Sequence, residues 1–169
     1  NAEDFYPNDP VVITVSHLGY IKRTPLSEFH EQARGGVGSK GANTRDKDFT
    51  EYIYPATMHQ TMLFFTKKGR CYWLKCYEIP EGDKTSKGRA IQNLLNIDAD
   101  DSVNAFLRVK GLNDVDFIKS HYIVFATKNG TVKKTSLEAY SRPRTNGVNA
   151  ITIAEGDEVV DVRLTNGKN

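Results

Sequence analysis

The sequence contains little of what a disulfide framework or a membrane segment would need. Its 169 residues include two cysteines, two methionines and one tryptophan. Its apolar stretches, such as residues 62–65, are only a few residues long. Two cysteines are too few for the disulfide framework of a small secreted protein, so we expect this protein in the reducing cytoplasm. A helix that crosses a bilayer needs about 20 consecutive apolar residues, so we expect no membrane partner.

What is present is the composition of an ordinary folded domain. Hydrophobic residues make up 38% of the chain and charged residues 26%. That composition suffices for one domain with a core and argues against wholesale disorder. The chain starts at Asn1 without a basic and apolar leader, so we expect it to be a piece of a larger protein.

The net charge of +2 conceals a strong segregation of charge along the chain. The windows 13–47, 63–90 and 121–149 carry +3, +4 and +4, and the remaining residues carry −9. Positive windows on an otherwise acidic chain are typical of a protein that binds a polyanion. Exposed hairpins rich in Lys and Arg are the alternative that charge alone leaves open.

The three basic windows are also copies of one pattern. In each copy an apolar residue lies six positions before a glycine, Ser or Thr lies three positions before it, and an apolar residue lies two positions after it. A second glycine follows, in the setting Ser-Lys-Gly or Thr-Asn-Gly. The first glycines are Gly19, Gly69 and Gly130, and the second glycines are Gly41, Gly88 and Gly147.

Each copy is predicted to form a β-hairpin, because short runs rich in β-branched and aromatic residues flank a tight turn. Glycine provides the positive φ that such turns require. We therefore predict an all-β fold, an incomplete β-propeller that forms one partial domain of about three four-stranded blades. The approximate blades are residues 10–56, 57–116 and 117–169. A sandwich or barrel of unrelated hairpins is the alternative. The only helical signals, weak ones, lie in residues 94–95 and 98–104.

A glycine-rich basic loop follows the first hairpin. Residues 35–41 hold four glycines, and Arg34 and Lys40 flank or interrupt them. Such a backbone can turn tightly and expose N–H groups to an anion, while the two cations add charge for a phosphate. A flexible connector is the alternative that the loop alone leaves open.

This loop resembles the gyrase-A box, consensus Gln-Arg-Arg-Gly-Gly-Lys-Gly, of the C-terminal domain of DNA gyrase A. Further segments that resemble that family are residues 19–24, 63–70, 77–81, 87–91 and 129–135. The resemblance implies a six-bladed β-pinwheel, a propeller variant, of which this chain would be the first three blades. It also implies that the basic perimeter binds and wraps duplex DNA, so that an ATP-driven type IIA topoisomerase can introduce negative supercoils.

The resemblance implies two groups of DNA-binding residues. The box group is Gln32, Arg34, Gly35, Gly36, Gly38 and Lys40. The basic rim group is Lys22, Arg23, Lys67, Lys68, Arg70, Lys75, Lys87, Arg89, Lys128, Lys133, Lys134, Arg142 and Arg144. Ala33 and Val37 stand where the box consensus has arginine and lysine. This departure keeps the related C-terminal domain of topoisomerase IV as an alternative.

The resemblance implies no catalytic residue, metal or cofactor in this chain. ATP and Mg²⁺ would act elsewhere in a holoenzyme that also contains the gyrase A core and gyrase B. The expected location is the cytoplasm, in association with the nucleoid. A cytosolic propeller that binds other proteins is a further alternative, although it would have no need for a concentration of cations on its repeated hairpins.

Sharper motifs fail on their spacing. Residues 98–104 begin like a calcium-binding loop, but Val103 occupies its glycine position and Val109 its glutamate position. Cys71 and Cys76 have no second Cys/His pair at zinc spacing, so we expect buried thiols. The four histidines are scattered, without the context of a nucleophile and its base. The single tryptophan and the aromatic residues of the same strands are expected in the core.

Overall fold

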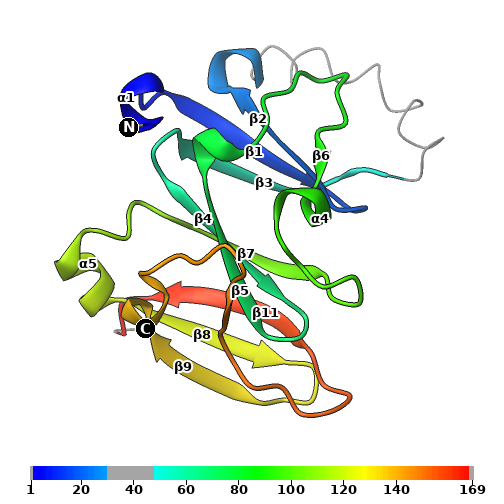
Figure 1. Ribbon diagram of the computed structural model, residues 1–169, viewed down its shortest axis with the longest axis vertical. Helices are drawn as coiled ribbons and strands as arrows, with labels where there is room; N and C mark the ends of the chain where they lie inside the picture. Colours follow the sequence, from blue (N-terminus) through cyan, green and yellow to red (C-terminus); the bar gives the residue numbers. More distant parts are fainter. Residues whose placement is uncertain (1, 30–47, 168–169) are drawn as a thin grey trace. The chain divides into compact units, whose positions relative to one another are not determined.

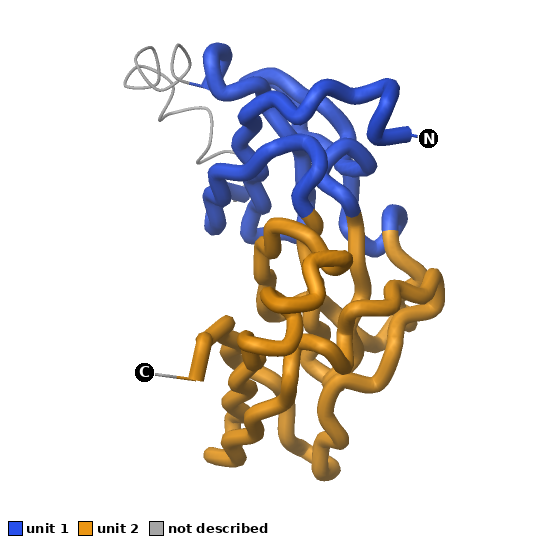
Figure 2. The backbone as a smooth tube through the Cα atoms, turned by 90° about the vertical axis from the view of Figure 1, so that its left-hand side faces the viewer, with its two compact units in different colours: residues 1–60, 75–94 blue, residues 61–74, 95–169 orange. Residues whose placement is uncertain are grey.

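The computed structural model describes residues 2–29 and 48–167. Three antiparallel sheets of four, four and three strands confirm the predicted all-β class. No helix in these two ranges is both long enough and apolar enough to cross a membrane. The chain divides into two compact units, residues 1–60 with 75–94, and residues 61–74 with 95–169 (Figure 2).

The first unit is built on a sheet with the strand order β3-β1-β2-β6 (Figure 1). Its strands are β1 (Pro10–Ser16), β2 (Tyr20–Pro25), β3 (Thr50–Thr57) and β6 (Arg89–Ala90). Its short helical turns are α1 (Ala2–Phe5), η2 (Cys76–Glu78) and α4 (Ile91–Leu94). The run 11–15 is buried throughout, as expected of a central strand that is covered on both faces.

The second unit holds the other two sheets, with the strand orders β10-β5-β4-β7 and β11-β8-β9. The second sheet consists of β4 (Thr61–Thr66), β5 (Arg70–Lys75), β7 (Val103–Val109) and β10 (Val148–Asn149). The third sheet consists of β8 (Tyr122–Thr127), β9 (Val132–Ser136) and β11 (Val159–Thr165). Its helices are α5 (Val115–Ser120) and η3 (Leu137–Tyr140).

Aromatic side chains form the centre of the second unit's core, as the sequence predicts. The ring centroids of Phe65 and Phe125 lie 5.4 Å apart in an edge-on arrangement, and both rings are fully buried. Trp73 Nε1 donates to the carbonyl oxygen of Tyr140 over 2.9 Å, and the Tyr140 hydroxyl donates to the carbonyl of Ala150 over 3.0 Å. The polar atoms of these aromatics are therefore satisfied inside the core.

The three predicted hairpins are β1–β2, β4–β5 and β8–β9, and each turns at its first glycine. The φ angles of Gly19, Gly69 and Gly130 are +92°, +93° and +93°, a conformation that glycine adopts at little cost. In each turn the glycine N–H donates over 3.0 Å to the carbonyl of the Ser or Thr three positions earlier. The hydroxyl of that residue accepts the N–H that follows the glycine, over 3.0–3.1 Å. The recurrence of Ser and Thr in the pattern thus has a structural cause.

An aspartate that precedes the third strand of each repeat closes each turn. One carboxylate oxygen of each accepts the N–H of the residue before the turn glycine, over 2.9–3.1 Å. The same oxygen also accepts the N–H of the residue after the aspartate. These turn aspartates are Asp48, Asp101 and Asp157.

In each of the first two sheets, one of the two edge strands comes from the following repeat. β6 pairs with β2 through Tyr20–Ala90 and Ile21–Arg89, and β10 pairs with β5 through Cys71–Val148 and Arg70–Asn149. Both short strands directly follow a second glycine of the repeated pattern. The division of the chain into blades 10–56, 57–116 and 117–169 stays a prediction about the sequence repeats. The first and second sheets each contain, in addition, a two-residue strand from the next repeat.

The helical segments differ from those expected. The weak signals in residues 94–95 and 98–104 were wrong for most of their length, because α4 ends at Leu94 and β7 begins at Val103. The sequence analysis also missed α5, which is capped by Asp114 accepting from the Phe117 N–H. At six residues, α5 is too short for a helical period to stand out.

Candidate nucleic-acid interface

The predicted box lies outside the described residues. Its members Gln32, Arg34, Gly35, Gly36, Gly38 and Lys40 therefore stay a prediction from sequence. The described part of the chain contains every member of the predicted basic rim. Eight members of the rim are exposed: Lys68, Lys87, Arg89, Lys128, Lys133, Lys134, Arg142 and Arg144. The half-buried members are Lys22, Arg23, Lys67, Arg70 and Lys75.

The two cations of β2 bind backbone carbonyls of their own unit. Lys22 Nζ donates to the carbonyl oxygens of Asp83 and Ser86 over 2.6 and 2.9 Å. Arg23 Nε donates to the carbonyl of Ile79 over 2.7 Å, and its side chain is only 11% exposed. Burial lowers the pKa of Lys22, although the charge of Asp83 partly offsets that effect. Some of the hydrogen-bond donors of both side chains are therefore already bound to the protein itself.

The segment that Lys22 contacts is a well-ordered turn, which we name the first carbonyl loop (residues 83–88). Asp83 Oδ1 accepts the N–H groups of Thr85 and Ser86 over 2.9 Å each, and the Thr85 hydroxyl over 2.7 Å. The hydrogen bond from the Thr85 hydroxyl, followed by those from the two N–H groups, lowers the pKa of Asp83. Lys84 and Lys87 are exposed on this loop.

A hollow of about 390 Å³ opens beside the first carbonyl loop. Lys22, Lys84 and Lys87 line it together with Tyr20, and Lys87 Nζ lies 4.3 Å from the centre of the Tyr20 ring. Asp48 also lines the hollow, and the Lys22 ammonium group binds backbone carbonyls. The exposed Lys84 and Lys87 still leave a positive surface, which favours an anionic ligand. Lys84 lies in the second basic window but is not a member of the predicted rim.

The second sheet has a comparable contact, made from a different position of the repeat. Arg70 Nη2 donates to the carbonyl oxygen of Asn146 over 2.6 Å. We name the segment 141–147 the second carbonyl loop. Arg142 and Arg144 are exposed on it. In both sheets a cation of the hairpin's second strand, Lys22 at the third position after the turn glycine and Arg70 at the first, therefore binds a carbonyl of the loop that precedes a second glycine.

Several rim cations carry charge that the described protein does not neutralise. Within residues 2–29 and 48–167, no ion pair within 4.0 Å involves Arg89, Lys128, Lys133, Arg142 or Arg144. By contrast, Lys68 pairs with Asp100, and Lys75 Nζ lies 3.0 Å from a carboxylate oxygen of Glu3. Unpaired exposed cations are the ones that can release counterions when they meet a phosphate.

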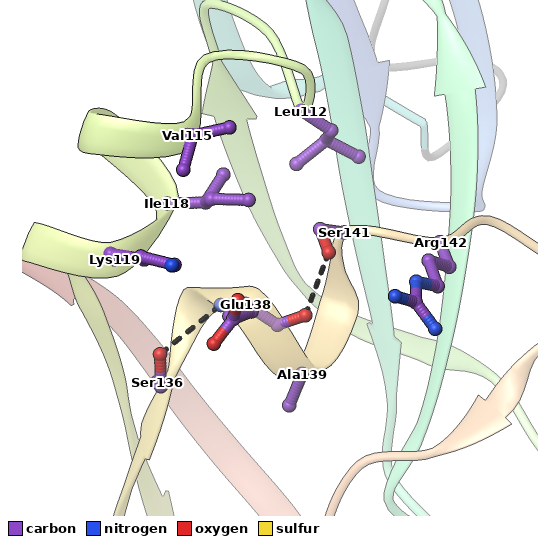
Figure 3. A pocket seen from close by; sticks show the side chains of 9 residues that line it. All are labelled: Leu112, Val115, Ile118, Lys119, Ser136, Glu138, Ala139, Ser141 and Arg142. Atoms are coloured by element: carbon purple, nitrogen blue, oxygen red, sulfur yellow. Dashed lines mark hydrogen bonds between the residues drawn. The ribbon is translucent and has the colours of Figure 1, made fainter.

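A second hollow, of about 840 Å³, lies between α5 and η3 (Figure 3). Its apolar lining includes Leu112 and Val115, while Lys119 and Arg142 bring positive charge to it. The hydroxyl of Ser141 donates to the carbonyl of Glu138 over 2.8 Å. No histidine or cysteine is among the residues that line this hollow.

The described residues also bear on the motifs that failed in the sequence. They contain no group of three or more His, Cys, Asp or Glu side chains arranged to hold a metal ion. Asp101, within the segment that resembles a calcium loop, is 4% exposed and serves as a turn aspartate. Both cysteines are buried thiols outside any disulfide, as predicted. Burial raises the pKa of the Cys71 thiol well above its usual value, which makes it unreactive.

Comparisons with known proteins agree with these observations. The family described as the DNA gyrase C-terminal domain, a β-propeller, matches residues 10–56, 60–110 and 121–166. The DNA gyrase A protein of Halalkalibacterium halodurans is 44% identical over 165 residues, which are 98% of this chain and 19% of that protein. Its counterpart in Aeromonas salmonicida is 41% identical over 169 residues, 100% of this chain and 18% of that protein. The chain thus spans about a fifth of the length of these relatives.

Two solved structures resemble the fold. The C-terminal domain of DNA topoisomerase IV superposes with a TM-score of 0.76 at 29% identity, covering 96% of this chain and 48% of that one. A DNA gyrase A C-terminal domain superposes with a TM-score of 0.64 at 16% identity, covering 93% of this chain and 48% of that one. The second likeness concerns the fold alone.

Proposed function

The chain belongs to the family of DNA gyrase C-terminal domains with the β-propeller fold, and from this premise we propose that it binds and wraps duplex DNA. In this proposal it performs no catalysis itself and serves a type IIA topoisomerase. The observation that carries the proposal is the set of exposed cations without ion pairs on the repeated hairpins and on the two carbonyl loops. These cations contact successive phosphates.

Wrapping needs many such contacts rather than one strong site. Smooth bending of a short duplex costs on the order of 1–6 kcal/mol, so the protein must offset that cost with several weak phosphate contacts. Each neutralised phosphate releases counterions. Phosphate contacts carry no base information, so selectivity in this mechanism comes from the deformability of the DNA rather than from its base edges.

The parent enzyme in this proposal is DNA gyrase rather than topoisomerase IV. Relatives that are 41–44% identical are DNA gyrase A proteins, whereas the likeness to topoisomerase IV reaches 29% identity. The proposed partners are duplex DNA, the gyrase A core and gyrase B, in the cytoplasm and associated with the nucleoid. ATP and Mg²⁺ act elsewhere in that holoenzyme.

The experiment that tests DNA binding is a titration of a linear duplex at several salt concentrations. We expect the logarithm of the binding constant to fall linearly with the logarithm of the salt concentration, with a slope of about −0.9 per neutralised phosphate. Binding that does not depend on salt, or no binding at low salt, contradicts the proposal. A change of base sequence in the duplex that preserves its flexibility should alter the affinity little.

The choice between gyrase and its paralogue has its own test. Ala33→Arg and Val37→Lys restore the two cations that the box consensus contains. In the holoenzyme we expect the double variant to wrap DNA more tightly and to supercoil at higher salt than the parent. Supercoiling activity that is absent in both proteins would favour a topoisomerase IV role.

A further inference from the structure

Two cations within the predicted rim point at the protein rather than at solvent. Lys22 Nζ binds two carbonyls of the first carbonyl loop, and Arg70 Nη2 binds one carbonyl of the second carbonyl loop. Neither residue belongs to the same repeat as the loop that it holds. The arrangement therefore links a hairpin to the segment that the next repeat lays against it.

Each carbonyl loop is also held at its far end. Gly88 and Gly147 have φ angles of +86° and +73° and end the loops. A Cβ at Gly147 would lie 2.8 Å from the Cys71 carbonyl oxygen, and a Cβ at Gly88 would overlap that of Ile21. The backbone can approach the sheet this closely only because both residues are glycines. The loops then continue into β6 and β10, which pair with the sheet.

The outward sides of the same loops carry cations. Lys84 and Lys87 are exposed on the first loop, and Arg142 and Arg144 are exposed on the second. None of the four makes an ion pair within 4.0 Å with a described residue. Each loop thus has one side fastened to the sheet and another side available to an anion.

We propose that Lys22 and Arg70 are positioning residues that fasten the carbonyl loops, and that Lys84, Lys87, Arg142 and Arg144 make the phosphate contacts. This inference rests on the proposed DNA binding. Lys84 thereby joins the predicted rim, and Lys22 and Arg70 leave the set of direct phosphate ligands. Burial lowers the pKa of Lys22, as expected of an ammonium group partly withdrawn from solvent.

The physical advantage of the fastening is preorganisation. A loose loop would lose conformational freedom when its cations settle on the DNA, and that loss would reduce the net affinity. A fastened loop has already lost the freedom during folding. Two ammonium hydrogen bonds to carbonyls are well suited to this task because a lysine has three donors and no acceptor.

The first experiment compares Lys22→Met with the double variant Lys84→Met/Lys87→Met in the whole protein. For Lys22→Met we expect faster amide hydrogen exchange in residues 85–91, an affinity for linear duplex that falls about 3- to 10-fold, and an unchanged salt slope. For the double variant we expect unchanged exchange and a slope about 1.8 units smaller. Lys22→Arg keeps the donors and should exchange like the parent.

The opposite result for Lys22→Met overturns the inference. A salt slope that shrinks by about 0.9 with unchanged exchange would make Lys22 a phosphate ligand. Lys110→Met removes an exposed lysine elsewhere and serves as the control for net charge. The exchange measurement needs no DNA. If the parent protein binds no duplex, the proposed function fails, while the exchange of residues 85–91 still decides whether Lys22 fastens the loop.

A second experiment separates charge from geometry at Asp83. Asp83→Asn removes a negative charge but keeps an oxygen that can accept the N–H groups of Thr85 and Ser86, whereas Asp83→Ala removes both. Simple electrostatics predicts that both variants bind DNA more tightly, by the same factor. Preorganisation predicts that Asp83→Ala binds at least about 3-fold more weakly than Asp83→Asn. Equal affinities of the two variants would overturn the inference.

Discussion

The second strands of the first and third hairpins carry two cations at the same two positions of the repeat, but those cations differ in what they contact. On β2, Lys22 and Arg23 are half-buried and donate to backbone carbonyls. On β9, Lys133 and Lys134 are exposed. β2 is bordered by β6, whereas in the described part of the chain β9 pairs only with β8. The role of a basic residue in this repeat therefore depends on whether another segment covers its strand.

The second hairpin supports that conclusion. Its residues at the same two positions are Tyr72 and Trp73, which are 3% and 9% exposed. β5 is bordered by β10, and Gly147 lies directly against the Tyr72 ring. A covered strand can thus use either aromatic residues or hydrogen-bonded cations at these positions. Positive charge in the sequence identifies candidate phosphate ligands. Whether such a residue is available to a phosphate depends on whether another segment covers its strand.

The largest expected effect comes from preventing the coverage of β2. Gly88→Ala places a Cβ against the Ile21 carbonyl at positive φ, so we expect the free energy of unfolding to fall by at least about 2–3 kcal/mol. Gly130→Ala is the matched control, because φ there is +93° but nothing lies within 4 Å of the new Cβ. It should cost about 1 kcal/mol. Urea unfolding measures both, and equal losses would contradict the close approach.

The next effect contrasts a covered cation with an uncovered one. Arg23→Met leaves the Ile79 carbonyl without its donor, so we expect a loss of about 1.5–3 kcal/mol of unfolding free energy. Lys134→Met should cost less than about 1 kcal/mol, because that side chain is exposed and its ammonium group lies over the Tyr122 ring, 4.5 Å from the ring centre. Urea midpoints compare the two. Comparable losses would mean that coverage does not distinguish the two strands.

The parts of this architecture that sequence could predict are those with local signals. Gly19, Gly69 and Gly130 occupy the turns because a two-residue turn and its flanking strands lie within about ten positions. The outer strands β6 and β10 could not be predicted in the same way. Each has two residues, too few for a period of two, and Arg89 pairs with Ile21 far away in sequence.

The candidate site shows the same division. The basic windows supplied the candidate phosphate ligands, but residue type could not reveal that Lys22 binds two carbonyls. That fact depends on a contact between two repeats. The turn aspartates were also missed as a set. An acidic residue before each third strand is visible in the sequence, yet only the hydrogen bonds distinguish Asp157, which closes a turn, from its neighbour Glu158.

In DNA binding the contrast between the two strands should reverse. Lys133→Gln/Lys134→Gln removes two uncovered cations, and we expect the salt slope to shrink by about 1.8 units while the urea midpoint stays near that of the parent. A titration of linear duplex at several salt concentrations provides the slope. Lys110→Gln/Lys119→Gln removes two exposed lysines outside the rim and controls for the same change in net charge. An unchanged slope in the double variant would exclude β9 from the interface.

The smallest expected effect concerns what the first and third hairpins share, their turn aspartates. Burial raises the pKa of Asp157, but hydrogen bonds from the Thr127 hydroxyl and from two backbone N–H groups outweigh it and hold the pKa below its usual value. Asp48 has a lowered pKa for the same reasons. A carboxyl whose pKa is lower in the folded protein stabilises it above the unfolded pKa of about 3.9, and that contribution disappears as the pH falls through the folded pKa.

We therefore expect Asp48→Asn and Asp157→Asn to be slightly less stable than the parent at pH 7 and equally stable at acidic pH, because the amide keeps an acceptor oxygen and lacks only the charge. Urea unfolding between pH 7 and pH 2.5 measures this convergence. Glu155→Gln, an exposed residue near the third turn, is the control. Since both turns have the same hydrogen bonds although only β2 is covered, the two variants should converge alike. If the stability of only one variant converged with that of the parent, the next repeat would influence the turn of the first hairpin as well as its second strand.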